Sequence, residues 1–125
     1  MPVRIKISIR DIVLEAELFD NATAKAIAGV LPVTAAPNEW GDEFYFAIPV
    51  MVPLDDSATE NVSVGDIGYW PPGSALAIFF GPTPMSSGSE PVPASAVNLV
   101  GRITADATVL RKAKGAKEIR IERRG

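Results

Sequence analysis

The 125-residue sequence contains no cysteine and no histidine, and these two absences exclude several kinds of chemistry. Without cysteine there are no disulfides and no thiol nucleophile, so cysteine usage gives no indication of the redox compartment. Without histidine, Ser-His-Asp and Cys-His catalytic groups cannot form, and the usual His/Cys zinc sites are excluded. Acid–base catalysis near neutral pH would need a carboxylate or a lysine with a strongly shifted pKa.

Long apolar runs are also missing. No run approaches the roughly 20 residues that a membrane-spanning helix needs, and the first residues alternate in the manner of a strand rather than a signal peptide. A composition that is 47% hydrophobic and 22% charged is typical of a globular protein. We therefore expect one domain over residues 1–125, in the cytoplasm, as a monomer or homodimer, with no cofactor, no metal and no membrane partner.

Positive charge is scarce in the middle of the chain. Residues 1–10 carry a net charge of +3 and residues 102–125 carry +5, whereas residues 11–101 carry −11. Basic ends can indicate a nucleic-acid partner. Here the charges alternate with apolar residues instead of forming a block, which favours pairing across neighbouring strands. We expect no nucleic acid as a partner.

The expected pairing can be stated by residue. If the first two strands form a hairpin, the outward Arg4 and Lys6 face the outward Glu15 and Glu17. The basic residues that this scheme leaves without partners are Arg111, Lys112, Lys114, Arg123 and Arg124.

A period of two in hydrophobicity predicts a mainly β protein. The predicted strands comprise residues 3–10, 14–18, 33–39, 43–48, 67–70, 75–80, 97–103 and 117–123. Two short helices are predicted, at residues 22–31 after the N-cap Asn21 and at residues 106–114. We expect a closed antiparallel barrel of about eight strands with the helices at its ends.

The chain is organised around residues 65–86, where Pro71-Pro72-Gly73 makes a rigid turn between two apolar strands. Tyr69 and Trp70 immediately precede this turn. Two interpretations remain open: these rings form a wall for a ligand, or they fill the end of the barrel as core. In the next strand, alternation predicts Phe80 in the core and Phe79 at the cleft.

The chain has one dense group of carboxylates next to aromatic residues, namely Glu39, Asp42 and Glu43. One of them could act as a base, together with Tyr45, or bind a divalent cation. A solvated turn beside a strand produces the same pattern and is the interpretation that we favour.

Three further polar residues, Ser86, Ser95 and Asn98, could donate hydrogen bonds into the cleft or could cap loop backbone. Ser86 has no histidine to activate it, which argues against a hydrolase nucleophile.

Four motifs resemble the small prokaryotic cyclophilin-like proteins, most of which have no assigned function. They are Glu-Trp-Gly-Asp-Glu-Phe-Tyr-Phe at 39–46, Val-Gly-Asp-Ile-Gly-Tyr-Trp-Pro-Pro-Gly at 64–73, Phe-Phe-Gly-Pro-Thr-Pro-Met-Ser at 79–86, and Pro-Ala-Ser-Ala-Val-Asn at 93–98. The resemblance spans nearly the whole chain and implies a cyclophilin-type barrel of about eight strands closed by two helices.

A more distant similarity links the chain to the cyclophilin prolyl isomerases. Residues 44–49, Phe-Tyr-Phe-Ala-Ile-Pro, are similar to the isomerase segment Phe-His-Arg-Ile-Ile-Pro, which places Phe46 at the catalytic arginine. Residues 77–80 lack the glutamine of the isomerase Ser-Gln-Phe-Phe segment, and Arg102 is the best substitute cation. The resemblance thus implies an aromatic pocket without its catalytic cation.

The leading hypothesis is that the chain binds a small molecule or an extended peptide in an aromatic cleft, without turnover. The alternatives are an atypical prolyl isomerase and a small-molecule enzyme that uses Glu43 and Tyr45. The predicted ligand-binding residues are Glu43, Tyr45, Tyr69, Trp70, Phe79, Met85, Ser86, Ser95 and Asn98.

Overall fold

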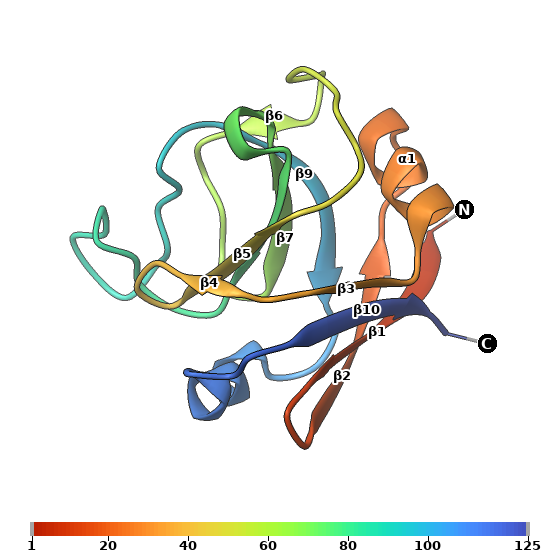
Figure 1. Cartoon of the computed structure of the whole chain (residues 1–125). Helices are drawn as coiled ribbons and strands as arrows, with labels where there is room; N and C mark the ends of the chain where they lie inside the picture. Colours follow the sequence, from red (N-terminus) through yellow and green to blue (C-terminus); the bar gives the residue numbers. More distant parts are fainter. Residues whose placement is uncertain (1, 125) are drawn as a thin grey trace.

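The computed structural model describes residues 2–124 as one curled antiparallel sheet with a single α-helix at one side (Figure 1). The strands are β1 (Val3–Ile9), β2 (Ile12–Leu18), β3 (Val33–Ala35), β4 (Asn38–Glu39), β5 (Glu43–Ala47), β6 (Ala58–Thr59), β7 (Asp66–Trp70), β8 (Ala75–Phe79), β9 (Val97–Ile103) and β10 (Ile119–Arg123). The helical segments are α1 (Ala22–Val30) and the 3-10 helices η1 (Pro71–Gly73) and η2 (Ala107–Ala113).

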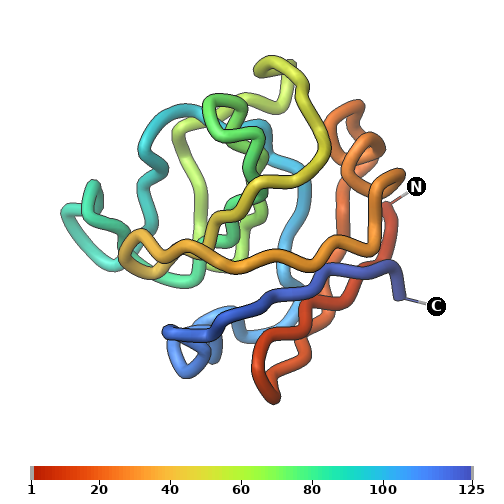
Figure 2. The backbone as a smooth tube through the Cα atoms, in the orientation of Figure 1, coloured from red at the N-terminus to blue at the C-terminus, as the bar shows by residue number. Residues whose placement is uncertain are grey.

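The sheet is open, so the prediction of a closed barrel of about eight strands was wrong. Its strands follow the order β3-β10-β1-β2-β9-β7-β8-β5-β4, and β6 pairs with β9 outside this path. The two edge strands, β3 and β4, are parts of one extended segment that crosses the open side of the half-barrel (Figure 2). One part pairs with β10 and the other with β5. Ala36 and Pro37 therefore connect the two edge strands within one segment of the chain. Proline has no backbone N–H, so Pro37 cannot donate a hydrogen bond to a neighbouring strand.

The local predictions at the N-terminal end are confirmed. In the β1–β2 hairpin, Arg4 lies opposite Glu17 and Lys6 lies opposite Glu15. The helix α1 begins after Asn21, whose Oδ1 accepts a hydrogen bond from the backbone N–H of Ala24 at 2.9 Å. This side chain satisfies one of the N–H groups that a helix start leaves without a partner.

The main hydrophobic core lies inside the curl of the sheet. Alternate residues of β1, β2 and β10 enter it from one side, and residues of β5, β7 and β8 enter it from the other. Phe44 and Phe80 pack within it with their ring centroids 4.7 Å apart. Phe80, Leu76 and Ile78 all lie in this core, as the period of two predicted.

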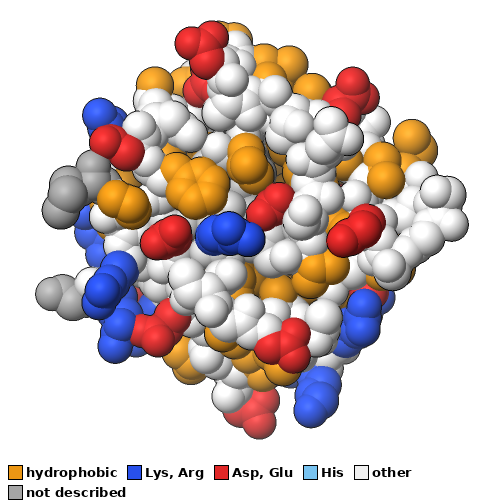
Figure 3. Space-filling view, turned by 180° about the vertical axis from the view of Figure 1, so that it is seen from behind, with side chains coloured by type: hydrophobic (Ala, Val, Ile, Leu, Met, Phe, Trp, Pro, Cys, Tyr) orange, Lys and Arg blue, Asp and Glu red, His pale blue; other side chains and the backbone are white. Residues whose placement is uncertain are grey.

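The basic residues of the C-terminal region are better partnered than the sequence suggested. Arg111 and Lys114 form ion pairs with Asp42 at 2.8 and 2.5 Å, and Arg124 pairs with Glu15. The expectation that these three would lack partners was therefore wrong. On the face seen from behind in Figure 3, basic and acidic side chains are interspersed rather than separated.

Within residues 2–124, no helix has the length and apolar character needed to cross a membrane.

Candidate functional site

The strand β8 divides its side chains between two hydrophobic clusters. Leu76 and Ile78 point into the main core, whereas Ala77 and Phe79 point to the opposite face of the sheet. There, Phe79, Ala77, Val62 and Val97 form a second, smaller cluster, against which Tyr45 and Trp70 pack. Because both faces of β8 are covered, all five of its residues are buried.

The register of the strands explains why this second face is hollow. Tyr45 on β5 lies opposite Ala77, and Trp70 on β7 lies opposite Ala75. Gly68 is the partner of Ala77 from the β7 side. The rings of Tyr45 and Trp70 therefore lie on either side of a row of small residues, Gly68, Ala75 and Ala77. Because these residues have little or no side chain, a space remains between the two rings.

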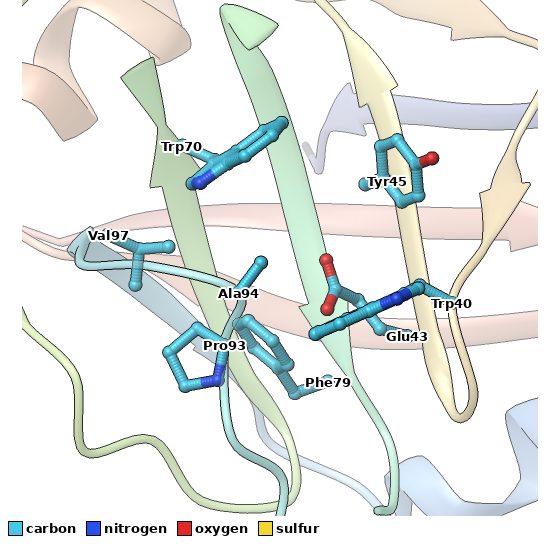
Figure 4. A pocket seen from close by; sticks show the side chains of 8 residues that line it. All are labelled: Trp40, Glu43, Tyr45, Trp70, Phe79, Pro93, Ala94 and Val97. Carbon is cyan, nitrogen blue, oxygen red and sulfur yellow. The ribbon is translucent and has the colours of Figure 1, made fainter. Parts of the chain in front are cut away.

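This space is a pocket of about 130 Å³. Its lining residues come from the β4–β5 turn, β5, β7, β8, the segment before β9 and the first residue of β9: Trp40, Glu43, Tyr45, Trp70, Phe79, Pro93, Ala94 and Val97. Figure 4 shows the carboxyl end of Glu43 directed into the space between the rings of Trp40 and Trp70. Four aromatic side chains and one carboxyl group therefore share a single pocket.

Trp70 forms one wall and does not fill the end of a barrel. It is half-buried, and its Nε1–H donates a hydrogen bond to Ser95 Oγ at 2.7 Å. Gly73 lies beneath the ring, because a Cβ at this position would approach two indole carbons to 3.0 Å. The Pro71–Gly73 turn and Ser95 together fix the orientation of the indole.

Trp40 forms a second wall, on the turn between β4 and β5. Its backbone N–H donates to the carbonyl of Glu43 at 3.0 Å. Gly41 has a φ of +60°, and a Cβ there would lie 2.9 Å from atoms of Pro82, Thr83 and Pro84. Only glycine allows this close approach without strain, so the turn is held against the segment that follows β8.

The three carboxylates of the acidic group have separate environments. Glu39 is exposed and accepts a hydrogen bond from the backbone N–H of Gly115 at 2.6 Å. Asp42 pairs with Arg111 and Lys114. Burial acts to raise the pKa of Asp42, but hydrogen bonds from these two cations outweigh it, and the pKa lies below its usual value.

Glu43 differs from both, and its assignment to a solvated turn was wrong. Only 7% of its surface is exposed, and its Oε1 is fully buried with no hydrogen-bond partner among residues 2–124. Burial raises the pKa of Glu43 to about 7, because desolvation disfavours the ionised form. A carboxyl group in this state is close to half-ionised at neutral pH.

The structure brings five of the nine predicted site residues to this pocket. Glu43, Tyr45, Trp70 and Phe79 line it, and Ser95 lies at its rim through its hydrogen bond to Trp70.

The other four predicted residues lie elsewhere. Tyr69 is in the main core, where its hydroxyl donates to the carbonyl of Val50 at 2.5 Å. Asn98 is fully buried and accepts a hydrogen bond from the backbone N–H of Asp55 at 2.9 Å. The Oγ of Ser86 accepts from Thr83 N at 2.9 Å and donates to Glu90 O at 2.7 Å, so it shapes its own loop. Met85 is 58% exposed.

Sequence reasoning missed four lining residues: Trp40, Pro93, Ala94 and Val97. Trp40 carried a usable signal, because a tryptophan beside a glycine in a predicted turn lies outside the alternating strand pattern that places side chains in the core. The segment that contains Pro93 and Ala94 carried no such signal, since only the folded chain brings it over β7 and β8. Arg102, the proposed substitute cation, is exposed and does not line the pocket.

The comparisons with known proteins agree on the fold. The family model described as Cyclophilin-like matches residues 3–122. The chain belongs to the cyclophilin-like family. Its structure is similar to the solution structure of a hypothetical protein from Archaeoglobus fulgidus, with 36% identity and a TM-score of 0.81 over 98% of this chain and 95% of that one. No curated protein matches the sequence.

Within this cyclophilin-like chain, Phe46 stands where the resemblance to isomerases places the catalytic arginine. Phe46 is buried in the main core, whereas its neighbour Tyr45 lines the pocket. The pocket and the position of the arginine therefore lie on opposite faces of β5.

Proposed function

We propose that this cyclophilin-like protein is a binding module, which holds a small molecule or one side chain of an extended peptide in the aromatic pocket without turnover. The observation that carries the proposal is the convergence of Trp40, Tyr45, Trp70 and Phe79 on one cavity. Aromatic rings bury large apolar areas and stay rigid when they bind, so four of them around one space favour ligand binding over an incidental surface hollow.

The size of the cavity limits the group that enters it. Its volume of about 130 Å³ is close to that of an engineered cavity of about 150 Å³ that binds benzene. Pockets for drug-sized ligands are larger, about 300–1,000 Å³. A ring-sized group therefore fits, and the remainder of a larger ligand or peptide would extend past the exposed Ala94 and Ser95 at the rim.

The pocket offers little for covalent catalysis. Its eight lining residues include no Ser, Thr, Lys or Arg, so the lining holds no aliphatic hydroxyl or amine that a neighbouring base could activate as a nucleophile. One observation favours a second candidate, acid–base catalysis by Glu43, because its pKa of about 7 suits proton transfer at neutral pH. Native mass spectrometry of protein purified without added ligand tests both functions, because it identifies a ligand that copurifies with the protein. If the protein leaves this ligand unchanged, the result supports binding. If the wild type converts the ligand and Glu43→Gln does not, the result supports catalysis.

Tryptophan fluorescence provides a direct binding assay, because both tryptophans of the chain line the pocket. We would titrate the protein with phenol, cyclohexanol and N-acetylprolinamide as ring-sized probes. At least one probe is expected to change the emission in a saturable way. Ala94→Phe places a ring at the exposed rim and is expected to abolish the change. The matched control is Val13→Phe, at a residue that is 58% exposed on β2 and outside the pocket. Absence of binding by every probe in the wild type would contradict the proposal.

Nucleic acid is not a partner under this proposal. Phosphate binding needs several cations free on one surface and weakens steeply with salt. Arg111, Lys114 and Arg124 are each engaged with a carboxylate, and Lys6 on β1 lies between Glu15 and Glu122 of the neighbouring strands. A gel shift with mixed DNA or RNA at moderate ionic strength is expected to show no complex; a micromolar, salt-sensitive complex would contradict this.

A further inference from the structure

Glu43 is the group in the pocket that the fold itself leaves unsatisfied. Its Oε1 is buried without a hydrogen-bond partner among residues 2–124, although the adjacent Asp42 has two cationic partners. A buried carboxyl oxygen without a partner costs free energy in the empty protein. A ligand that supplies both a proton donor and a positive charge would remove this cost.

The rings around Glu43 favour the same sign of charge. The face of an aromatic ring carries negative electrostatic potential and attracts cations, most strongly for tryptophan. Trp40, Tyr45 and Trp70 are partly buried and border the cavity, and none of its eight lining residues is basic. The carboxyl group and the aromatic faces therefore act together on a cation and both disfavour an anion.

We propose that the ligand of this pocket presents a protonated alkylamine, whose N–H donates to the Glu43 carboxyl group while its alkyl groups contact the aromatic walls. This inference rests on the proposed binding function and specifies the chemistry of its ligand. A cavity of about 130 Å³ admits an ammonium group with a few alkyl carbons. Two sources share this chemistry, a free small amine and the methylated lysine side chain of a peptide.

The pH dependence of binding follows from the ionisation of Glu43. In the empty protein its pKa is about 7, and a bound cation lowers it, so binding releases a proton. The affinity for a cation is therefore expected to rise about tenfold from pH 6 to pH 8, as the ionised fraction increases. The only other titratable lining residue is Tyr45, and the charge of the adjacent Asp42 is balanced by Arg111 and Lys114.

Three small probes of similar shape separate the contribution of the positive charge from that of the N–H group. Trimethylammonium carries a charge and an N–H, tetramethylammonium carries a charge without an N–H, and tert-butanol carries a hydroxyl without a charge. At pH 8, tryptophan fluorescence and NMR titrations of the full chain are expected to show trimethylammonium binding at least tenfold tighter than tert-butanol. The same titrations are expected to show trimethylammonium binding severalfold tighter than tetramethylammonium.

Two variants locate the effect. Glu43→Gln is expected to reduce the preference for trimethylammonium over tert-butanol to less than twofold and to remove the pH dependence. Ala94→Phe is expected to block all three probes. If Glu43→Gln does not fold, the order of the three probes on the wild-type protein still decides the inference.

The outcomes distinguish this inference from the proposed function. If tert-butanol binds as tightly as trimethylammonium, the cation inference is overturned while the pocket remains a binding site. Equal binding of tetramethylammonium and trimethylammonium overturns the role of the N–H. Failure of these probes together with phenol, cyclohexanol and N-acetylprolinamide overturns the proposed function itself. A dimethyllysine peptide that binds more than tenfold tighter than free dimethylethylammonium supports a peptide source, and equal affinities support a free amine.

Discussion

The two hydrophobic clusters of this protein are built from the same strands but are closed to different degrees. The main core is enclosed by the curled sheet together with α1 and η2, and its rings, such as Phe44 and Phe80, have no exposed surface. The second cluster, around Phe79 and Val97, has the sheet on one side and is covered otherwise by non-strand residues, namely Val62, Trp40 and the segment near Ala94. The main core is therefore filled by side chains, whereas the second cluster leaves a pocket. Where a loop instead of a strand covers a sheet face, small residues beneath it remain as a hollow.

Removal of a ring from the main core should have the largest effect. Phe80→Ala deletes a fully buried ring that packs on Phe44, and we expect a loss of about 3–5 kcal/mol in the free energy of unfolding. Urea denaturation measures this loss. Met85→Ala is the control, because an exposed side chain usually contributes within about 0.5 kcal/mol. A cost for Phe80→Ala below about 1 kcal/mol would show that the main core is not closed as described.

The second-largest effect concerns Glu43, in the open cluster. The pKa of Glu43 in the folded state, about 7, exceeds its ordinary value of 4.5. The folded protein therefore binds the carboxyl proton of Glu43 more tightly than the unfolded chain does. The stabilisation that comes from this proton is fully present below pH 4.5 and is lost as the pH rises from about 4.5 to 7. The loss amounts to at most about 3–4 kcal/mol, since one pKa unit corresponds to about 1.4 kcal/mol.

The variant Glu43→Gln isolates this contribution, because glutamine does not titrate and the other carboxylates are unchanged. Urea denaturation from pH 4.5 to pH 8.5 is expected to show the variant gaining stability over the wild type as the pH rises. Parallel stability curves for the two proteins would mean that Glu43 is solvated or paired in the folded state.

Trp70 should matter more for binding than for stability. It is half-buried, so Trp70→Ala is expected to cost less than about 2 kcal/mol, below the ~3–5 kcal/mol typical of a fully buried large ring. The same change removes one wall of the pocket and should weaken probe binding at least tenfold. Thermal melts and fluorescence titrations, the latter through the remaining Trp40, measure the two effects. Trp70→Phe retains a ring but loses the hydrogen bond to Ser95, and should be intermediate. A loss of stability equal to that of Phe80→Ala would place Trp70 in the core.

The smallest expected signal is prolyl isomerisation. Because Phe46 faces the main core and no lining residue of the pocket is cationic, the pocket has no cationic donor to stabilise the twisted prolyl amide and lower the barrier. We expect no acceleration of cis/trans exchange on standard Xaa-Pro peptides, measured beside an active cyclophilin isomerase. A catalysed rate that survives repurification and disappears in Ala94→Phe would overturn this prediction.

Local patterns in the sequence determined much of the secondary structure. The period of two separated Phe79 from Phe80 and Tyr45 from Phe46, because successive side chains of a strand point to opposite faces. Asn21 marked the start of α1, since its side chain accepts a hydrogen bond from a residue three positions along. These features depend on neighbours in the chain and can therefore be predicted without a structure.

The opening of the sheet and the environment of Glu43 were decided only by tertiary structure. The two edge strands follow each other along one extended segment. β3 pairs with β10, which is distant in sequence, whereas β4 pairs with β5, which follows it directly, so the position of the open side depends on where β10 packs in the folded chain. The three acidic residues Glu39, Asp42 and Glu43 look alike in sequence. Their differences come from Arg111 on η2 and Lys114 directly after it, which form ion pairs with Asp42, and from β8 and the segment near Ala94, which take Glu43 out of water. Desolvation and ion pairing depend on which distant residues arrive beside a group, and only the folded chain determines that.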